Sequence, residues 1–73
     1  MDVVVGKKYR HFKGNIYIVI CIAKDSETLE DLVIYKDINS DKYWARKYSM
    51  FTSKVDKEKY PEVKQEYRFE QLD

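Results

Sequence analysis

The sequence is poor in cysteine, histidine, proline and glycine. Its 73 residues include one cysteine, one histidine, one proline and two glycines. The single cysteine, Cys21, excludes a disulfide within the chain, and without partners at metal-ligand spacing it predicts no zinc site. We therefore expect no metal and no cofactor, and a reducing, cytoplasmic setting fits best.

Long hydrophobic runs and a large net charge are also missing. The longest apolar run, "IYIVICIA", has eight residues, well below the roughly 18 that a membrane helix needs. The N-terminal "MDVVVGKK" has too few apolar residues for the core of a signal peptide. The 14 Lys and Arg residues nearly cancel the 13 Asp and Glu residues, which leaves a formal charge of +1. These features argue against a membrane protein and against general affinity for nucleic acid.

Aromatic residues are abundant by contrast. Seven Tyr, three Phe and one Trp make up 15% of the chain, and large aromatic side chains fit the half-buried surface of a small β-sheet. The length leaves no room for a second domain, so we expect one domain over residues 1–73.

Alternating and apolar stretches predict five strands. The first two are "KKYRHFK" and "NIYIVICIAK", joined by a tight turn at Gly14 and Asn15, two residues that tolerate positive φ. Residues 25–31 are ambiguous, because Asp25 or Ser26 could begin a helix. We expect a loop or single turn there, because the following "LVIYKDI" is rich in β-branched and aromatic residues.

The second half of the chain supplies the other strands. A strand over residues 32–37 is followed by turn chemistry in "NSDK", a fourth strand in "KYWARKY" and a helical turn in "SMF". Residues 52–66 alternate Lys with acids around Pro61, which predicts a solvated charged arm. The closing "EYRFEQL" can return to the sheet. The expected fold is all-β: a small, strongly bent, five-stranded antiparallel SH3-like barrel with one short helical turn.

Most of the chain resembles a known bacterial family. The stretch "KYRHFKGNIYIVICIAKDSETLEDLVIYKD", followed by "YWARKYSMF" and "RFEQL", closely resembles the family called domain of unknown function 1653. The matching signature positions are Tyr9, His11, Lys13, Gly14, Tyr17, Ala23, Ser26, Glu27, Thr28, Glu30, Val33, Tyr35, Trp44, Arg46, Met50 and Phe51. The family usually has a proline where Lys47 stands here. The resemblance implies a fold and no reaction.

Arg46 has two interpretations. It shares a strand face with Trp44 by alternation, so its guanidinium needs acceptors if Trp44 is packed. Glu27 and Glu30 could supply them in a structural ion pair. Alternatively, Arg46 anchors an anion beside a Trp44 platform.

His11 is equally open. It is either a half-buried imidazole with a structural hydrogen bond, or part of a polar pocket with Lys13, Ser26, Glu27 and Thr28. A catalytic version would need Ser26 or Cys21 as nucleophile with His11 and Glu27 as partners. Cys21 lies inside the most apolar strand, where a buried thiol is usually inert. So small a barrel offers little enclosed space, which disfavours an enzyme.

Three function classes follow. The leading hypothesis is a noncatalytic binding module, a monomer or weak homodimer, for a small anionic ligand, a peptide or a partner protein. Its predicted site residues are His11, Lys13, Ser26, Glu27, Thr28, Glu30, Trp44 and Arg46. The first alternative is single-stranded nucleic-acid binding along residues 7–13, through Lys8, Tyr9, Arg10 and Phe12. The second is a small hydrolase-like enzyme that uses His11.

Overall fold

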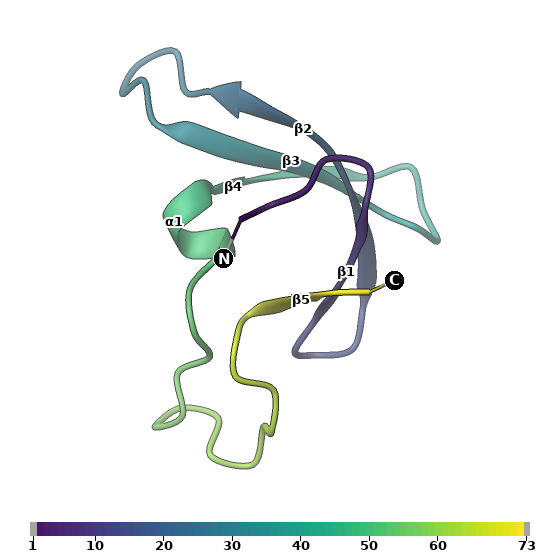
Figure 1. Cartoon of the computed structure of the whole chain (residues 1–73), viewed down its shortest axis with the longest axis vertical. Coiled ribbons are helices and arrows are strands. Elements are labelled where there is room, and N and C mark those ends of the chain that lie inside the picture. Colours follow the sequence, from purple (N-terminus) through teal and green to yellow (C-terminus); the bar gives the residue numbers. More distant parts are fainter. Residues whose placement is uncertain (1, 73) are drawn as a thin grey trace.

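The computed structural model describes residues 2–72 and consists of one antiparallel sheet and a short helix (Figure 1). The elements are β1 (Lys8–His11), β2 (Ile16–Lys24), β3 (Asp31–Asp37), β4 (Tyr43–Lys47), α1 (Tyr48–Phe51) and β5 (Phe69–Gln71). The five strands and the helical turn therefore form where the sequence predicted them, with ends that differ by a few residues. No helix in the described part of the chain has the length and apolar character needed to cross a membrane.

The strand order is β4-β3-β2-β1-β5, so the first four strands form a meander and β5 returns to pair with β1. Every pair is antiparallel, and a bulge interrupts the β2–β3 register between Val19 and Cys21. Strands β4 and β5 end the sheet and are not paired with each other. The pairing thus defines an open sheet, and the closed, strongly bent SH3-like barrel that the sequence suggested is not shown.

The β1–β2 hairpin forms at the predicted position with a different turn. The Gly14 N–H donates to the His11 carbonyl at 2.7 Å, and the His11 N–H donates to the Asn15 carbonyl at 2.8 Å. Gly14 has φ +107°, whereas Asn15 is not in the positive-φ region. This is a three-residue loop with glycine at its left-handed position, rather than a two-residue primed turn.

The segment between β2 and β3 is a loop, as expected, and Asp25 organises it. Its Oδ1 accepts the N–H groups of Glu27 at 2.8 Å and Thr28 at 3.2 Å. Leu29 follows with φ 63°, a left-handed conformation, and its side chain is 70% exposed. Strand β3 then begins at Asp31, one residue before the predicted start.

The hydrophobic core is built largely from aromatic rings on one face of the sheet. It contains Tyr9, Val19, Val33, Tyr35, Phe51 and Phe69, all nearly or fully buried. The rings of Phe51 and Phe69 stack at 4.0 Å with 6° between their planes, and Tyr35 meets both edge-on. The short helix therefore closes the core by placing Phe51 under β5.

The charged arm extends from residue 52 to residue 68 in the structure, two residues beyond its predicted end, because β5 begins only at Phe69. Hydrogen bonds to backbone carbonyls fix it to the sheet. The Gln65 side-chain amide donates to the carbonyls of Arg10 at 3.1 Å and Tyr67 at 2.9 Å. The Phe12 N–H donates to the Arg68 carbonyl at 3.0 Å, and the Arg68 N–H donates to the Ser53 carbonyl at 2.9 Å. The arm therefore lies against the β1–β2 hairpin, at the opposite end of the molecule from the β2–β3 loop (Figure 1).

Candidate functional site

A pocket of about 430 Å³ lies where the β1–β2 hairpin, β4 and the charged arm meet. This volume is in the range of small-molecule sites. Strand register places Tyr35 directly opposite Trp44 on the pocket side of the sheet, and Arg46 follows two residues later on the same face. The lining residues are His11, Phe12, Lys13, Asn15, Tyr17, Tyr35, Trp44, Arg46, Asp56, Lys59, Tyr60, Arg68 and Phe69.

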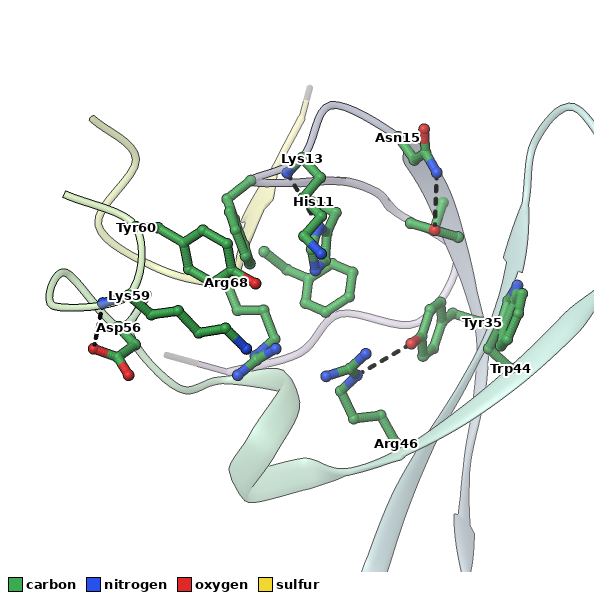
Figure 2. Close-up of a pocket in the computed structure, with 13 residues that line it drawn as sticks. His11, Lys13, Asn15, Tyr35, Trp44, Arg46, Asp56, Lys59, Tyr60 and Arg68 are labelled. Atoms are coloured by element: carbon green, nitrogen blue, oxygen red, sulfur yellow. Dashed lines mark hydrogen bonds between the residues drawn. The ribbon is translucent and has the colours of Figure 1, made fainter. Parts of the chain in front are cut away.

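Two guanidinium groups face this pocket (Figure 2). Arg46 Nε donates to the Tyr35 hydroxyl and Arg68 Nε donates to Ser53 Oγ, each at 3.2 Å. These bonds leave the terminal Nη groups of both arginines without a hydrogen-bond partner within residues 2–72. Neither arginine forms an ion pair with a carboxylate in the same range, where the ion pairs all involve lysine. The pocket thus presents two guanidinium groups that no carboxylate neutralises.

His11 lies beside these cations as a neutral imidazole. Its Nδ1 accepts the Lys13 N–H at 3.1 Å, so the ring proton of the neutral form is on Nε2. The ring is held by Phe12, stacked at 4.4 Å, and by Phe69, edge-on at 5.0 Å. Burial, together with repulsion from Arg46, Arg68 and Lys13, lowers the pKa of His11 from 6.5 to about 4. His11 is therefore a hydrogen-bond donor through Nε2 and a poor base at neutral pH.

The remaining wall is basic and aromatic. Lys13 and Lys59 place their Nζ atoms 5.5 and 5.4 Å from the Tyr60 ring centroid, and Tyr60 packs on Phe12 at 4.9 Å. Asp56 is the single acid of the lining. Its Oδ1 accepts the backbone N–H groups of Glu58 and Lys59, at 3.0 and 3.3 Å. The pocket therefore holds four cationic side chains against one acid, whereas the whole chain carries only +1.

The structure brings together only half of the site that the sequence predicted. His11, Lys13, Trp44 and Arg46 line the pocket, but Ser26, Glu27, Thr28 and Glu30 do not. The latter four belong to the β2–β3 loop, where Thr28 Oγ1 accepts the Glu30 N–H at 3.2 Å. The Glu30 carboxylate lies 3.3 Å from Lys47 Nζ, so the expected ion pair of Arg46 with Glu27 or Glu30 is wrong.

The residues proposed to bind single-stranded nucleic acid do not lie on one face of the sheet. Tyr9 is only 1% exposed and packs in the core, so it offers no stacking surface. Phe12 lies in the pocket wall instead. Lys8 and Arg10 are exposed and, by alternation, lie on the opposite face of the sheet from Tyr9. These four residues therefore form no common basic and aromatic surface.

The candidates for a catalytic set are also dispersed. Cys21 is exposed, which corrects the expectation of a buried thiol. Neither Cys21 nor Ser26 lines the pocket around His11. Between residues 2 and 72, no group of three or more His, Cys, Asp or Glu side chains is arranged to hold a metal ion.

Sequence reasoning missed the contribution of the arm. Asp56, Lys59 and Tyr60 line the pocket but lie in a stretch that the sequence predicts as a solvated loop. Arg68 also lines the pocket and lies in the stretch predicted as the fifth strand. The sequence signal for docking is weak: three arm residues, Val55, Tyr60 and Val63, are apolar or aromatic among many charges. Of these, Val55 is buried in the structure.

Together, the fold and the pocket define a small antiparallel β protein with a basic, aromatic-walled cavity beside the end of its sheet. The profile of the protein family described as "Protein of unknown function (DUF1653)" matches residues 7–71. The chain therefore belongs to this family. No curated protein and no solved structure is significantly similar to it.

Proposed function

We propose that the protein binds a small anionic ligand in the pocket, as a binding module and not as an enzyme. The observation that supports this proposal is the pair of guanidinium groups, Arg46 and Arg68, that face one cavity with no carboxylate partner within residues 2–72. Guanidinium groups bind oxyanions through paired N–H donors. An oxyanion between them would also accept a hydrogen bond from the Nε2–H group of His11.

The lowered pKa of His11 agrees with an electropositive cavity. Burial is the largest cause of the lowered pKa, and the positive charges of Arg46, Arg68 and Lys13 add to it because they disfavour the imidazolium form. A bound oxyanion would relieve the repulsion among these groups. A noncatalytic role is supported by the lining, which holds no serine or cysteine nucleophile among the described residues.

The test is a titration of the protein with inorganic phosphate and pyrophosphate, followed by amide chemical shifts and by the fluorescence of the single tryptophan, Trp44. We expect shifts centred on His11, Arg46 and Arg68. Arg46→Met and Arg68→Met should each weaken binding by about tenfold to a hundredfold, because a hydrogen bond to a charged group contributes about 1.5–3 kcal/mol.

Arg10→Met is the matched control, because it removes the same charge from the exposed opposite face of β1. Its affinity should stay within about twofold of the unmodified protein, since an exposed charge outside the site is largely screened. If Arg10→Met weakened anion binding as much as Arg46→Met does, the loss of affinity would be due to the change in net charge and not to a contact in the pocket. Absence of binding by the unmodified protein would refute the proposal.

A further inference from the structure

We propose that the anion bound in this pocket is a phosphate group attached to a planar ring, with Trp44 as the surface on which the ring stacks. This inference rests on the proposed function and names its ligand class. The nucleoside monophosphates are the representative ligands. The same chemistry is presented by a free mononucleotide and by the 5′-phosphorylated end of a nucleic-acid strand.

The charge of the pocket favours phosphate over carboxylate. Lys13, Arg46, Lys59 and Arg68 line the cavity against Asp56 alone. Asp56 already accepts two backbone N–H groups. A doubly charged phosphate offsets this excess of positive charge better than a singly charged carboxylate does.

Trp44 supplies the ring surface because, among the described rings that line the pocket, it alone is exposed. Tyr35 and Phe69 are buried in the core, and Phe12 is stacked on His11 and packed against Tyr60. Trp44 is 47% exposed, lines the pocket, and takes part in no ring pair within residues 2–72. A solvent-exposed indole at the mouth of a cavity can stack on any planar ring.

Strand geometry places the backbone positions of Trp44 and Arg46 close together. Trp44 and Arg46 are two residues apart on the same face of β4, a separation of about 7 Å along an extended strand. This is the separation of the two Cα atoms, and from it we expect a short linker, such as one sugar, between a ring on Trp44 and a phosphate at Arg46. Figure 2 shows Trp44 of β4 beside Tyr35 of β3, with the Arg46 side chain directed toward Arg68.

The experiment compares AMP, ribose 5-phosphate and adenosine by isothermal calorimetry on the unmodified protein. We expect AMP to bind roughly 5- to 100-fold more tightly than ribose 5-phosphate, because stacking of one base has that effect. Adenosine should not bind measurably. Equal affinities for AMP and ribose 5-phosphate would overturn the ring inference and leave anion binding intact. Absence of binding by both would overturn the ring inference, and it would overturn anion binding as well only if phosphate and pyrophosphate also fail to bind.

Trp44→Leu should reduce the affinity for AMP to that of ribose 5-phosphate and leave ribose 5-phosphate unchanged. Tyr43→Leu is the matched control, because Tyr43 is 61% exposed and points to the opposite face of the same strand. The inference fails if Tyr43→Leu weakens AMP binding as much as Trp44→Leu does.

A second comparison separates the two sources of the ligand. A 5′-phosphorylated oligonucleotide that binds at least tenfold more tightly than its 5′-hydroxyl form would indicate a strand end. Binding of AMP without binding of either oligonucleotide would indicate a free nucleotide. Equal binding of both oligonucleotides would show that backbone phosphates are recognised, and would overturn the inference.

Discussion

His11 reports directly on the charge of the pocket, because it is the only histidine of the chain and lies among Arg46, Arg68 and Lys13. Its pKa is about 4 in the free protein. A bound oxyanion places negative charge beside the imidazole, and we expect this to raise the pKa toward the ordinary value. The measurement is an NMR pH titration of the single imidazole signal, with and without saturating sulfate.

Linkage fixes the sign of the accompanying pH effect. Because the bound form of the protein takes up a proton at higher pH than the free form, affinity for sulfate should increase as the pH falls between the two pKa values and should be constant above them. Sulfate is the suitable probe because its own charge does not change over this range. His11→Asn should remove this increase, because the variant lacks the imidazole. An unchanged His11 pKa at saturating sulfate would contradict the prediction.

Among the elements, the β2–β3 loop is where the sequence and the structure differ most in function. Its Ser, Thr and Glu residues suggested a ligand-binding loop. In the structure, the Asp25 and Thr28 side chains instead bond the backbone of the loop itself. Such local hydrogen bonds are the ordinary role of these residue types in turns. Their pattern in sequence is the same for both roles, so spacing could not distinguish them.

Leu29 is a position of backbone strain in this loop, and its effect on stability can be measured. It adopts φ 63° and is 70% exposed, so it has the steric cost of a left-handed conformation with little burial in return. Leu29→Gly should raise the free energy of unfolding relative to Leu29→Ala by up to about 1 kcal/mol, because glycine lacks the Cβ clash but loses more chain entropy. Chemical denaturation of the two variants measures the difference. If the Leu29→Ala variant were more stable than the Leu29→Gly variant, backbone strain at this position would be excluded.

The strands were predictable because their signals are local. Each of these signals reflects contacts within a few residues: the alternation in β1 and β5, the apolar run of β2, and the Asn, Ser and Asp residues of the turn before β4. The Asp37 and Ser40 side chains accept N–H groups two residues later, as the turn chemistry indicated. The turn of the first hairpin differed because Gly14 alone has positive φ, a distinction between loop types that "KGN" does not encode.

At the scale of the whole molecule, the site depends on contacts between distant parts of the chain. Four of the thirteen lining residues of the pocket come from an arm that carries few apolar residues and docks through Gln65 and through backbone bonds of Phe12 and Arg68. Backbone hydrogen bonds leave almost no trace in side-chain patterns. Alternation could therefore place Trp44 and Arg46 on one strand face, but it could not bring Arg68 to them.

Phe69 links this pocket to the core, and that link can be tested. Its fully buried ring stacks on Phe51 at 4.0 Å, while its pocket side contacts His11 edge-on and lies 5.8 Å from the Arg46 guanidinium carbon. The same ring therefore supports both the fold and the position of two site residues. Phe51 shares the stack but does not line the pocket.

Phe69→Leu and Phe51→Leu should consequently separate stability from binding. Each removes one ring of the stack and keeps an apolar side chain, so each should lower the free energy of unfolding by about 1–3 kcal/mol in chemical denaturation. Only Phe69→Leu withdraws the surface on which His11 and Arg46 rest, and we expect it alone to weaken phosphate binding, by roughly threefold to tenfold. Calorimetry on both variants, at a temperature where both are folded, measures the affinities. Equal losses of affinity would mean that general loosening of the core controls the pocket, whereas a loss confined to Phe69→Leu would establish Phe69 as a positioning residue.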